Sequence, residues 1–131
     1  MRRSGLQHGR ISAIVAAMGH GDLLVIADVG LPIPSGVECI DLAVCGGVPR
    51  FLDVLRPIAA ELAIESIVLA AELESGNRPL VDEIAGLTGN LPARVVSHEE
   101  FKAITACAVA VIRTGETTAY ANVILTGGVA F

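Results

Sequence analysis

A histidine and an aspartate lie eight residues apart near the start of the chain, and both side chains can exchange protons. Gly19 and Gly21 flank His20, which lets the chain turn sharply there. Asp28 directly follows an apolar run that predicts a buried strand, and ligands of α/β sheets gather beyond the carboxyl ends of strands. A carboxylate near a histidine fixes its tautomer and suits general acid–base catalysis. The same two residues could also serve only as helix and loop caps.

Two segments further along the chain could hold a polar ligand. His98 falls in the first turn of an expected helix, where backbone N–H groups and a ring nitrogen can meet a ligand, although a surface histidine is the simpler interpretation. Tyr120, the single tyrosine, precedes Ala121 and Asn122. On an extended segment, Tyr120 and Asn122 would share one side and offer donors and acceptors to sugar hydroxyls. An exposed edge strand would explain this segment equally well.

Several familiar motifs are missing from the sequence. The glycine pairs at 46–47 and 127–128 fit neither the dinucleotide-binding pattern nor the P-loop pattern. Three separated histidines, with no HxxxH or CxxC spacing, argue against a metal site. Ser35 lies outside any GxSxG elbow. We therefore expect no metal, no cofactor and no serine-hydrolase chemistry.

The composition bears on partners and on assembly. The net charge is −5, and no basic patch is interleaved with aromatic residues, so we expect no nucleic-acid partner. Hydrophobic residues make up 53% of the chain and aromatic residues only 3%, which predicts a core of small aliphatic side chains. In a short chain this apolar excess also indicates a buried subunit interface, so we expect a homo-oligomer.

The cysteines and the ends of the chain bear on the compartment. The number of cysteines is odd and no CxxC pair occurs, which favours a reduced, cytoplasmic protein with buried thiols: Cys39, Cys45 and Cys107. Arginines precede the apolar stretch 11–19, but its apolar residues recur at helical spacing, so we expect a folded first helix and not a secretory signal. The longest uncharged run, 117–131, contains threonines, an asparagine and glycines, so we expect no membrane span.

Apolar runs alternate with helical patterns along the chain. We expect strands at 23–27, 37–44, 67–71, 93–96, 108–112 and 123–125, and helices beginning near 11, 49, 79 and 97. Ser97 followed by Glu100 resembles a capping box for the last of these helices. Such alternation predicts an α/β fold, a single three-layer α/β/α domain over residues 1–131 with a mostly parallel, mixed sheet.

Read as strings, these segments resemble the D-ribose pyranase family. The similarity runs through the whole chain in order, in the strings Gly19-His20-Gly21-Asp22, Asp28-Val29-Gly30-Leu31-Pro32-Ile33-Pro34, Gly47-Val48-Pro49, His98-Glu99-Glu100-Phe101-Lys102, Ile112-Arg113-Thr114-Gly115-Glu116 and Tyr120-Ala121-Asn122-Val123-Ile124-Leu125. The related L-fucose mutarotases share the Gly-His-Gly-Asp string but carry a different loop where this chain has Gly-Leu-Pro-Ile-Pro. Residues 74–93 contribute little to the resemblance.

The resemblance implies a function and a set of site residues. It implies an isomerase that interconverts the pyranose and furanose forms of D-ribose without metal or coenzyme, in decamers built from two pentameric rings. His20 would be the proton donor, and Asp28, His98 and residues 120–122 (Tyr120, Ala121, Asn122) would contact the sugar. Ring opening needs an acid, a base and groups that hold hydroxyls, all of which the residues can supply. A mutarotase of another sugar, such as L-fucose, and a non-catalytic sugar-binding module remain as alternatives.

Overall fold

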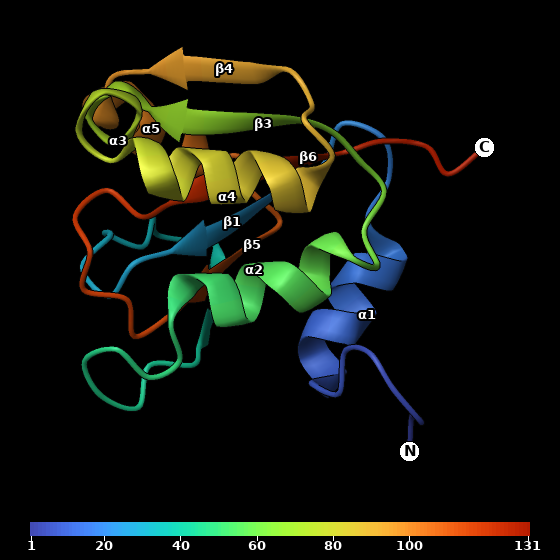
Figure 1. The fold of residues 1–131 in the computed structure, drawn as a ribbon. Helices are drawn as coiled ribbons and strands as arrows, with labels where there is room; N and C mark the ends of the chain where they lie inside the picture. Colours follow the sequence, from blue (N-terminus) through green and yellow to red (C-terminus); the bar gives the residue numbers. More distant parts are fainter.

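The computed structural model describes residues 1–131, which fold around one six-stranded sheet (Figure 1). The strands are β1 (Leu23–Ala27), β2 (Glu38–Asp41), β3 (Ile64–Ala70), β4 (Ala93–Val96), β5 (Ala110–Arg113) and β6 (Val123–Gly127). Their order across the sheet is β2-β5-β1-β6-β3-β4. Only β6 runs antiparallel to its neighbours, β1 and β3. The sheet is therefore mixed and mostly parallel, as the sequence predicts.

Helices cover both faces of this sheet. They are α1 (Gly9–Ala17), α2 (Phe51–Ala59), α3 (Ala71–Gly76), α4 (Arg78–Thr88) and α5 (His98–Thr105). The apolar sides of α1, α2 and α4 pack on one face, and α5 packs on the other, which Figure 1 shows behind the sheet. The predicted three-layer α/β/α fold is confirmed.

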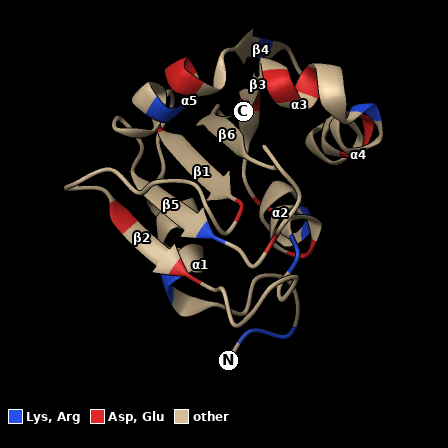
Figure 2. Ribbon diagram, turned by 90° about the vertical axis from the view of Figure 1, so that its left-hand side faces the viewer, with Lys and Arg blue, Asp and Glu red and all other residues tan.

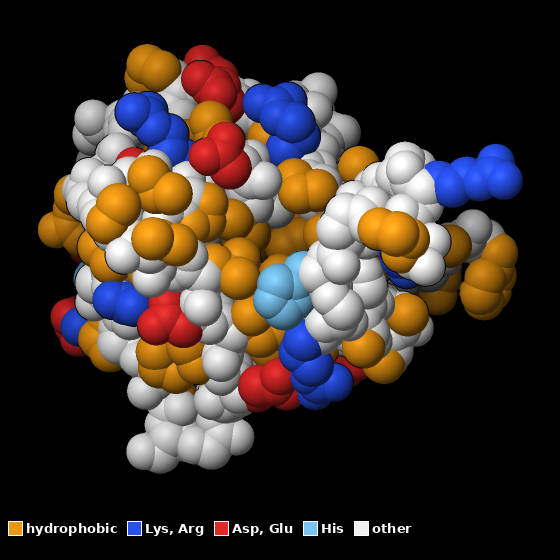
Figure 3. All heavy atoms as spheres, turned by 90° about the horizontal axis from the view of Figure 1, so that it is seen from below, with side chains coloured by type: hydrophobic (Ala, Val, Ile, Leu, Met, Phe, Trp, Pro, Cys, Tyr) orange, Lys and Arg blue, Asp and Glu red, His pale blue; other side chains and the backbone are white.

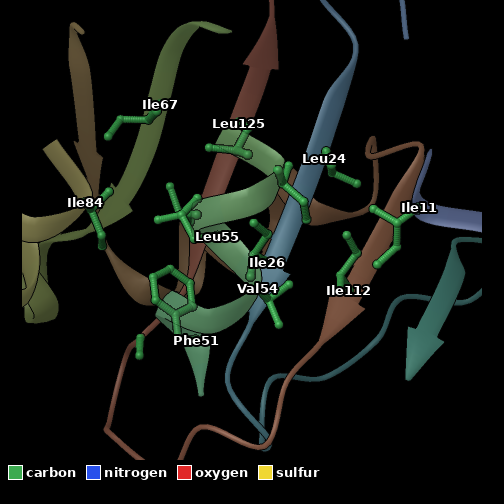
Figure 4. Packing of buried hydrophobic residues seen from close by; sticks show 14 of the residues in the cluster. Ile11, Leu24, Ile26, Phe51, Val54, Leu55, Ile67, Ile84, Ile112 and Leu125 are labelled. Carbon is green, nitrogen blue, oxygen red and sulfur yellow. The ribbon is translucent and has the colours of Figure 1, made fainter. Parts of the chain in front are cut away.

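Alternation along the central strands divides the core in two. Because successive side chains of a strand point to opposite faces, Leu24 and Ile26 of β1 join the larger cluster under α1, α2 and α4 (Figure 4). Val25 lies in the smaller cluster, which Phe101 of α5 covers. Leu55 of α2 is completely buried in the larger cluster. This packing holds the strands in place, and it therefore also positions the loops at both ends of the strands.

Of the expected capping box only the Ser97 half forms, because the Glu100 carboxylate pairs with Arg94, and the second strand is shorter than expected. The Ser97 hydroxyl accepts the Glu100 backbone N–H at 3.1 Å and so caps α5. Strand β2 ends at Asp41, not at residue 44. The Asp41 carboxylate accepts the N–H of Ala43 at 3.0 Å and turns the chain out of the sheet.

The prediction of buried thiols is wrong for the folded chain. Cys39, Cys45 and Cys107 are all free and exposed. Cys39 lies on the edge strand β2, Cys45 lies in the loop that follows it, and Cys107 lies in the turn after α5.

Apolar side chains also reach the surface on the underside of the molecule (Figure 3). None of the helices has the length and apolar character needed to cross a membrane.

Candidate functional site

Asp28 and Asn122 meet at the carboxyl edge of the sheet, which Figure 2 shows from the strand ends. Asp28 directly follows β1 and Asn122 directly precedes β6, and these strands are antiparallel neighbours, so the two residues lie side by side. The Asp28 backbone N–H donates to Asn122 Oδ1 at 2.7 Å, and Asn122 Nδ2 donates to Asp28 Oδ2 at 3.1 Å. Asn122 is completely buried. This double link holds the Asp28 carboxylate in one orientation.

Tyr120 is not on an extended segment, which corrects the expectation from sequence. Its φ is +61°, in the left-handed region that non-glycine residues seldom adopt. The turn is closed by the Asn122 N–H, which donates to the Tyr120 carbonyl at 2.8 Å. As a result Tyr120 remains 37% exposed, whereas Ala121 and Asn122 are buried. Strained backbone of this kind clusters at binding and catalytic sites.

His98 packs against Tyr120. The two rings meet edge to face, with centroids 5.0 Å apart. The Phe101 ring stacks nearly parallel to the His98 ring, with a centroid distance of 6.4 Å. The His98 backbone N–H donates to both carboxylate oxygens of Glu72 at 3.1 Å. The ring Nδ1 of His98 is buried and has no hydrogen-bond partner. Since buried polar atoms are nearly always paired, this unpaired nitrogen marks His98 as a candidate contact for a bound group.

A hollow of about 400 Å³ and one of about 310 Å³ flank the segment that leads to Tyr120. The smaller one is lined by Glu72, Asn77, Thr118 and Tyr120. It offers carboxylate, amide and hydroxyl groups beside an aromatic ring, a set suited to a small polyhydroxylated ligand. It has no cluster of three or more His, Cys, Asp or Glu side chains arranged for a metal ion.

Glu116 ties this segment to the rest of the fold. Its carboxylate accepts the Phe51 N–H at the start of α2 at 3.1 Å, and the N–H and hydroxyl of Thr118 at 3.2 and 2.9 Å. Partial burial alone would raise the pKa of Glu116, but these hydrogen bonds outweigh it and lower the pKa below its ordinary value. The charged carboxylate therefore anchors the turn that presents Tyr120.

His20 lies at the opposite edge of the sheet, so the structure does not bring it close to Asp28. Strand β1 separates the two residues, and its five residues span about 17 Å. His20 occupies a turn in which the Gly21 N–H donates to the Gly127 carbonyl at 2.9 Å. The carboxylate beside His20 is Glu65, whose Oε2 lies 2.8 Å from His20 Nε2. The expected pairing of His20 with Asp28 is wrong within one chain.

The chain end shares this second edge with His20. A hollow of about 400 Å³ there is lined by His20, Met18, Leu62 and the tail 127–131. Val129 and Phe131 of the tail are exposed. The tail thus lies beside His20 and away from Asn122, which it follows in sequence.

Two acidic residues beside the predicted site residues were not anticipated from the sequence, Glu65 and Glu72. Glu65 is the one charged residue of strand β3, whose other residues are apolar except Ser66, and this is the signal that could have marked it. Glu72 follows the carboxyl end of that strand, the position already used to select Asp28. Its partner, the His98 N–H, could not be foreseen without the pairing of β3 with β4.

Comparison with known proteins assigns the chain to a family. A model of the RbsD / FucU transport protein family matches residues 1–130. A D-ribose pyranase of Symbiobacterium thermophilum is 52% identical over 131 residues, with complete coverage of both chains. The structure of Bacillus subtilis RbsD complexed with D-ribose is 44% identical, covers both chains completely and superimposes with a TM-score of 0.94.

A more distant solved structure marks the other branch of this group. The fucose mutarotase of Streptococcus pneumoniae, in complex with L-fucose, is 25% identical and covers 95% of this chain and 94% of its own, with a TM-score of 0.72. The sequence similarity to the ribose proteins is therefore much higher than to this fucose protein. With a matching family model over nearly its whole length, the chain belongs to the RbsD / FucU transport protein family.

Proposed function

We propose that this chain is a D-ribose pyranase, an isomerase that interconverts the pyranose and furanose forms of D-ribose. The observation that carries the proposal is full-length identity of 44–52% to D-ribose pyranases and to a protein solved with D-ribose. The buried, unpaired Nδ1 of His98 beside the strained Tyr120 supports a polar ligand at the same edge. Asp28, Asn122 and Ala121 complete the proposed sugar-holding edge.

The reaction consists of ring opening and ring reclosure, and each of them combines two proton transfers with the breaking or forming of one carbon–oxygen bond. The anomeric hydroxyl loses its proton to a base, a role that we assign to the half-buried Asp28 carboxylate. The bond between the anomeric carbon and the ring oxygen breaks, and the ring oxygen receives a proton from His20. The 4-hydroxyl of the open aldehyde then attacks the carbonyl carbon and gives up its proton as the carbonyl oxygen gains one. No electron carrier is needed, because nothing is oxidised or reduced.

The sugar-holding groups each suit a different part of the ligand. The Tyr120 ring can stack on the apolar face of the sugar, or its hydroxyl can hydrogen-bond to it. His98 Nδ1 can accept or donate one hydrogen bond, depending on its tautomer. Asn122 uses one donor and one acceptor on Asp28, so it acts on the sugar chiefly through that carboxylate. The backbone of Ala121 connects these two side chains.

A complete site requires a second copy of the chain, because His20 and Asp28 lie at opposite edges of one subunit. In a head-to-tail ring, the His20 edge of one subunit meets the sugar-holding edge of the next, which is how closed rings form. The exposed Val129 and Phe131 beside His20 provide apolar surface for such a contact. We therefore propose a homo-oligomer with shared sites, in the form of a decamer of two pentameric rings. Three exposed free thiols suit a reducing, cytoplasmic location.

Exchange of sugar signals by NMR tests the activity directly. The protein, with a chelator and no nucleotide, is added to equilibrated D-ribose, and saturation transfer between pyranose and furanose signals is measured. We expect faster exchange than in buffer alone, and buffer-like rates would refute the proposal. A parallel sample of L-fucose separates the alternatives, since faster exchange of its anomers and not of ribose ring forms would indicate a fucose mutarotase.

A further inference from the structure

An irregularity in strand β3 directs the Glu65 side chain toward His20. In the pairing of β3 with β6, Ile64 faces Gly127, whereas Ser66 faces the very next residue, Thr126. Glu65 is therefore the extra residue of a β-bulge, a feature that re-aims a side chain and occurs next to active sites. The re-aimed carboxylate reaches His20, with Oε2 at 2.8 Å from Nε2.

The backbone segments that carry His20 and Glu65 are closely packed against the end of β6. A Cβ atom added to Gly128 would lie 3.0 Å from the Cβ of Glu65, so a side chain at this position would press on Glu65. One added to Gly127 would lie 2.7 Å from the carbonyl oxygen of Gly19, next to His20. The Asp22 carboxylate accepts the Gly19 N–H at 2.8 Å and closes the turn that carries His20. The backbone at both members of the pair is thus held by its packing against the β6 end.

The pair itself contributes little to the stability of the fold. The His20 and Glu65 side chains are 64% and 43% exposed, and exposed ion pairs stabilise a fold only slightly. A bulge, a close approach of glycine backbone and a short contact therefore surround an interaction of small structural value. We take this as an indication that the contact serves the histidine.

We propose, on the basis of the proposed pyranase function, that Glu65 is a positioning residue that fixes the tautomer and orientation of His20. A carboxylate can only accept, so Nε2 carries the hydrogen in this contact and Nδ1 is the nitrogen that exchanges a proton with the sugar. Nδ1 of His20 has no hydrogen-bond partner within the chain. When the ring oxygen takes the Nδ1 proton, the imidazole becomes neutral with its Nε2–H still on Glu65. On reclosure the same Nδ1 takes a proton back, so the residue returns to its starting state.

Nitrogen NMR and kinetics on Glu65 variants test this assignment. In the full-length protein with ¹⁵N-labelled histidine, the neutral His20 ring should show the Nε2–H tautomer, and Glu65→Ala should shift it toward a mixture. Glu65→Ala should lower kcat for ribose exchange about 10- to 100-fold with little change in KM, as for removal of a carboxylate that orients a functional histidine. Glu65→Gln keeps an oxygen acceptor and should lie between the two. Glu38→Gln, which breaks an exposed ion pair to Arg10 at the far strand β2, is the matched control and should leave kcat unchanged.

The outcomes separate this proposal from the proposed function. An unchanged His20 tautomer together with unchanged kcat in Glu65→Ala would overturn the positioning role, even if the wild-type protein is fully active. A purely structural role predicts instead a lower melting temperature with the His20 tautomer unaltered, which would also overturn it. Absence of ribose exchange in the wild-type protein would refute the pyranase function, and the tautomer measurement would still decide the His20–Glu65 contact.

Discussion

The two edges of the sheet differ in how completely a single chain builds them. At the sugar-holding edge, Asn122 is completely buried and doubly bonded to Asp28, and Tyr120 and His98 pack ring against ring. At the other edge, His20 is mostly exposed and has one side-chain partner, Glu65, beside the chain end. The first edge is therefore preorganised within one subunit, whereas the second is completed by a neighbouring copy in the ring that we propose. In the proposed function, the sugar-holding edge therefore supplies the binding groups and the base Asp28, whereas the other edge supplies the proton donor His20.

Removal of His20 should separate the functions of the two edges most strongly. His20→Ala should slow pyranose–furanose exchange about 10²- to 10⁴-fold, the usual contribution of a positioned acid–base group. Ribose affinity should change little, because the sugar-holding edge is intact. NMR exchange rates and calorimetry on the same sample check both points. Near-native exchange in this variant would assign the proton transfer elsewhere, with His98 as the next candidate.

Removal of Asn122 should affect the sugar-holding edge instead. Asn122→Ala leaves the Asp28 N–H unpaired and frees its carboxylate, which should weaken ribose binding roughly 5- to 150-fold, for a cost of about 1–3 kcal/mol. The rate of the saturated enzyme should fall less than the affinity. Calorimetry measures the affinity, and thermal unfolding shows how much of the loss is a stability effect. Unchanged ribose affinity would remove this segment from the site.

How far the sequence predicts this arrangement depends on which contacts are local. Apolar runs and turn residues predict that the first strand ends just before Asp28 and that Ser97 caps a helix, and both predictions are confirmed. A residue before a strand and one after it must lie at opposite edges, so the separation of His20 from Asp28 was predictable in principle. The left-handed Tyr120 was not, because tyrosine rarely adopts that conformation. The bulge at Glu65 depends on the register with β6, which no local pattern encodes.

Removal of the tail should weaken the subunit contact at the His20 edge and leave the sugar-holding edge unchanged. Deletion of residues 128–131 takes away Val129 and Phe131, which are exposed beside His20 in the single chain. If these apolar groups cover a neighbouring subunit, the deletion should shift the protein toward smaller species and reduce exchange activity several-fold. Light scattering and NMR exchange measure the two effects. A full-sized, fully active assembly without the tail would show that the tail has no part in the contact.

The smallest expected effect concerns Glu116, which anchors the turn before Tyr120. Its pKa is lowered in the folded chain, so its contribution to stability is present above the unfolded-state pKa and is lost as pH falls through the folded-state pKa. Glu116→Gln should therefore lower the free energy of unfolding at pH 7, by about 1 kcal/mol or less for this partly exposed group. The variant should lose less stability than the wild type on acidification. Denaturant unfolding at neutral and acidic pH checks this, and parallel pH profiles would contradict it.

Mixed assemblies of two variants test whether each site combines His20 of one subunit with Asp28 of another. His20→Ala and Asp28→Asn should each be nearly inactive alone, and Asn at position 28 can still accept the Asn122 amide hydrogen bond. When the two variants are coexpressed in equal amounts, random mixing in a head-to-tail ring gives about one quarter of the sites both native groups. We therefore expect recovery of about a quarter of the wild-type exchange rate per subunit. Mixed assemblies, verified by mass spectrometry, that stay as inactive as the separate variants would contradict it.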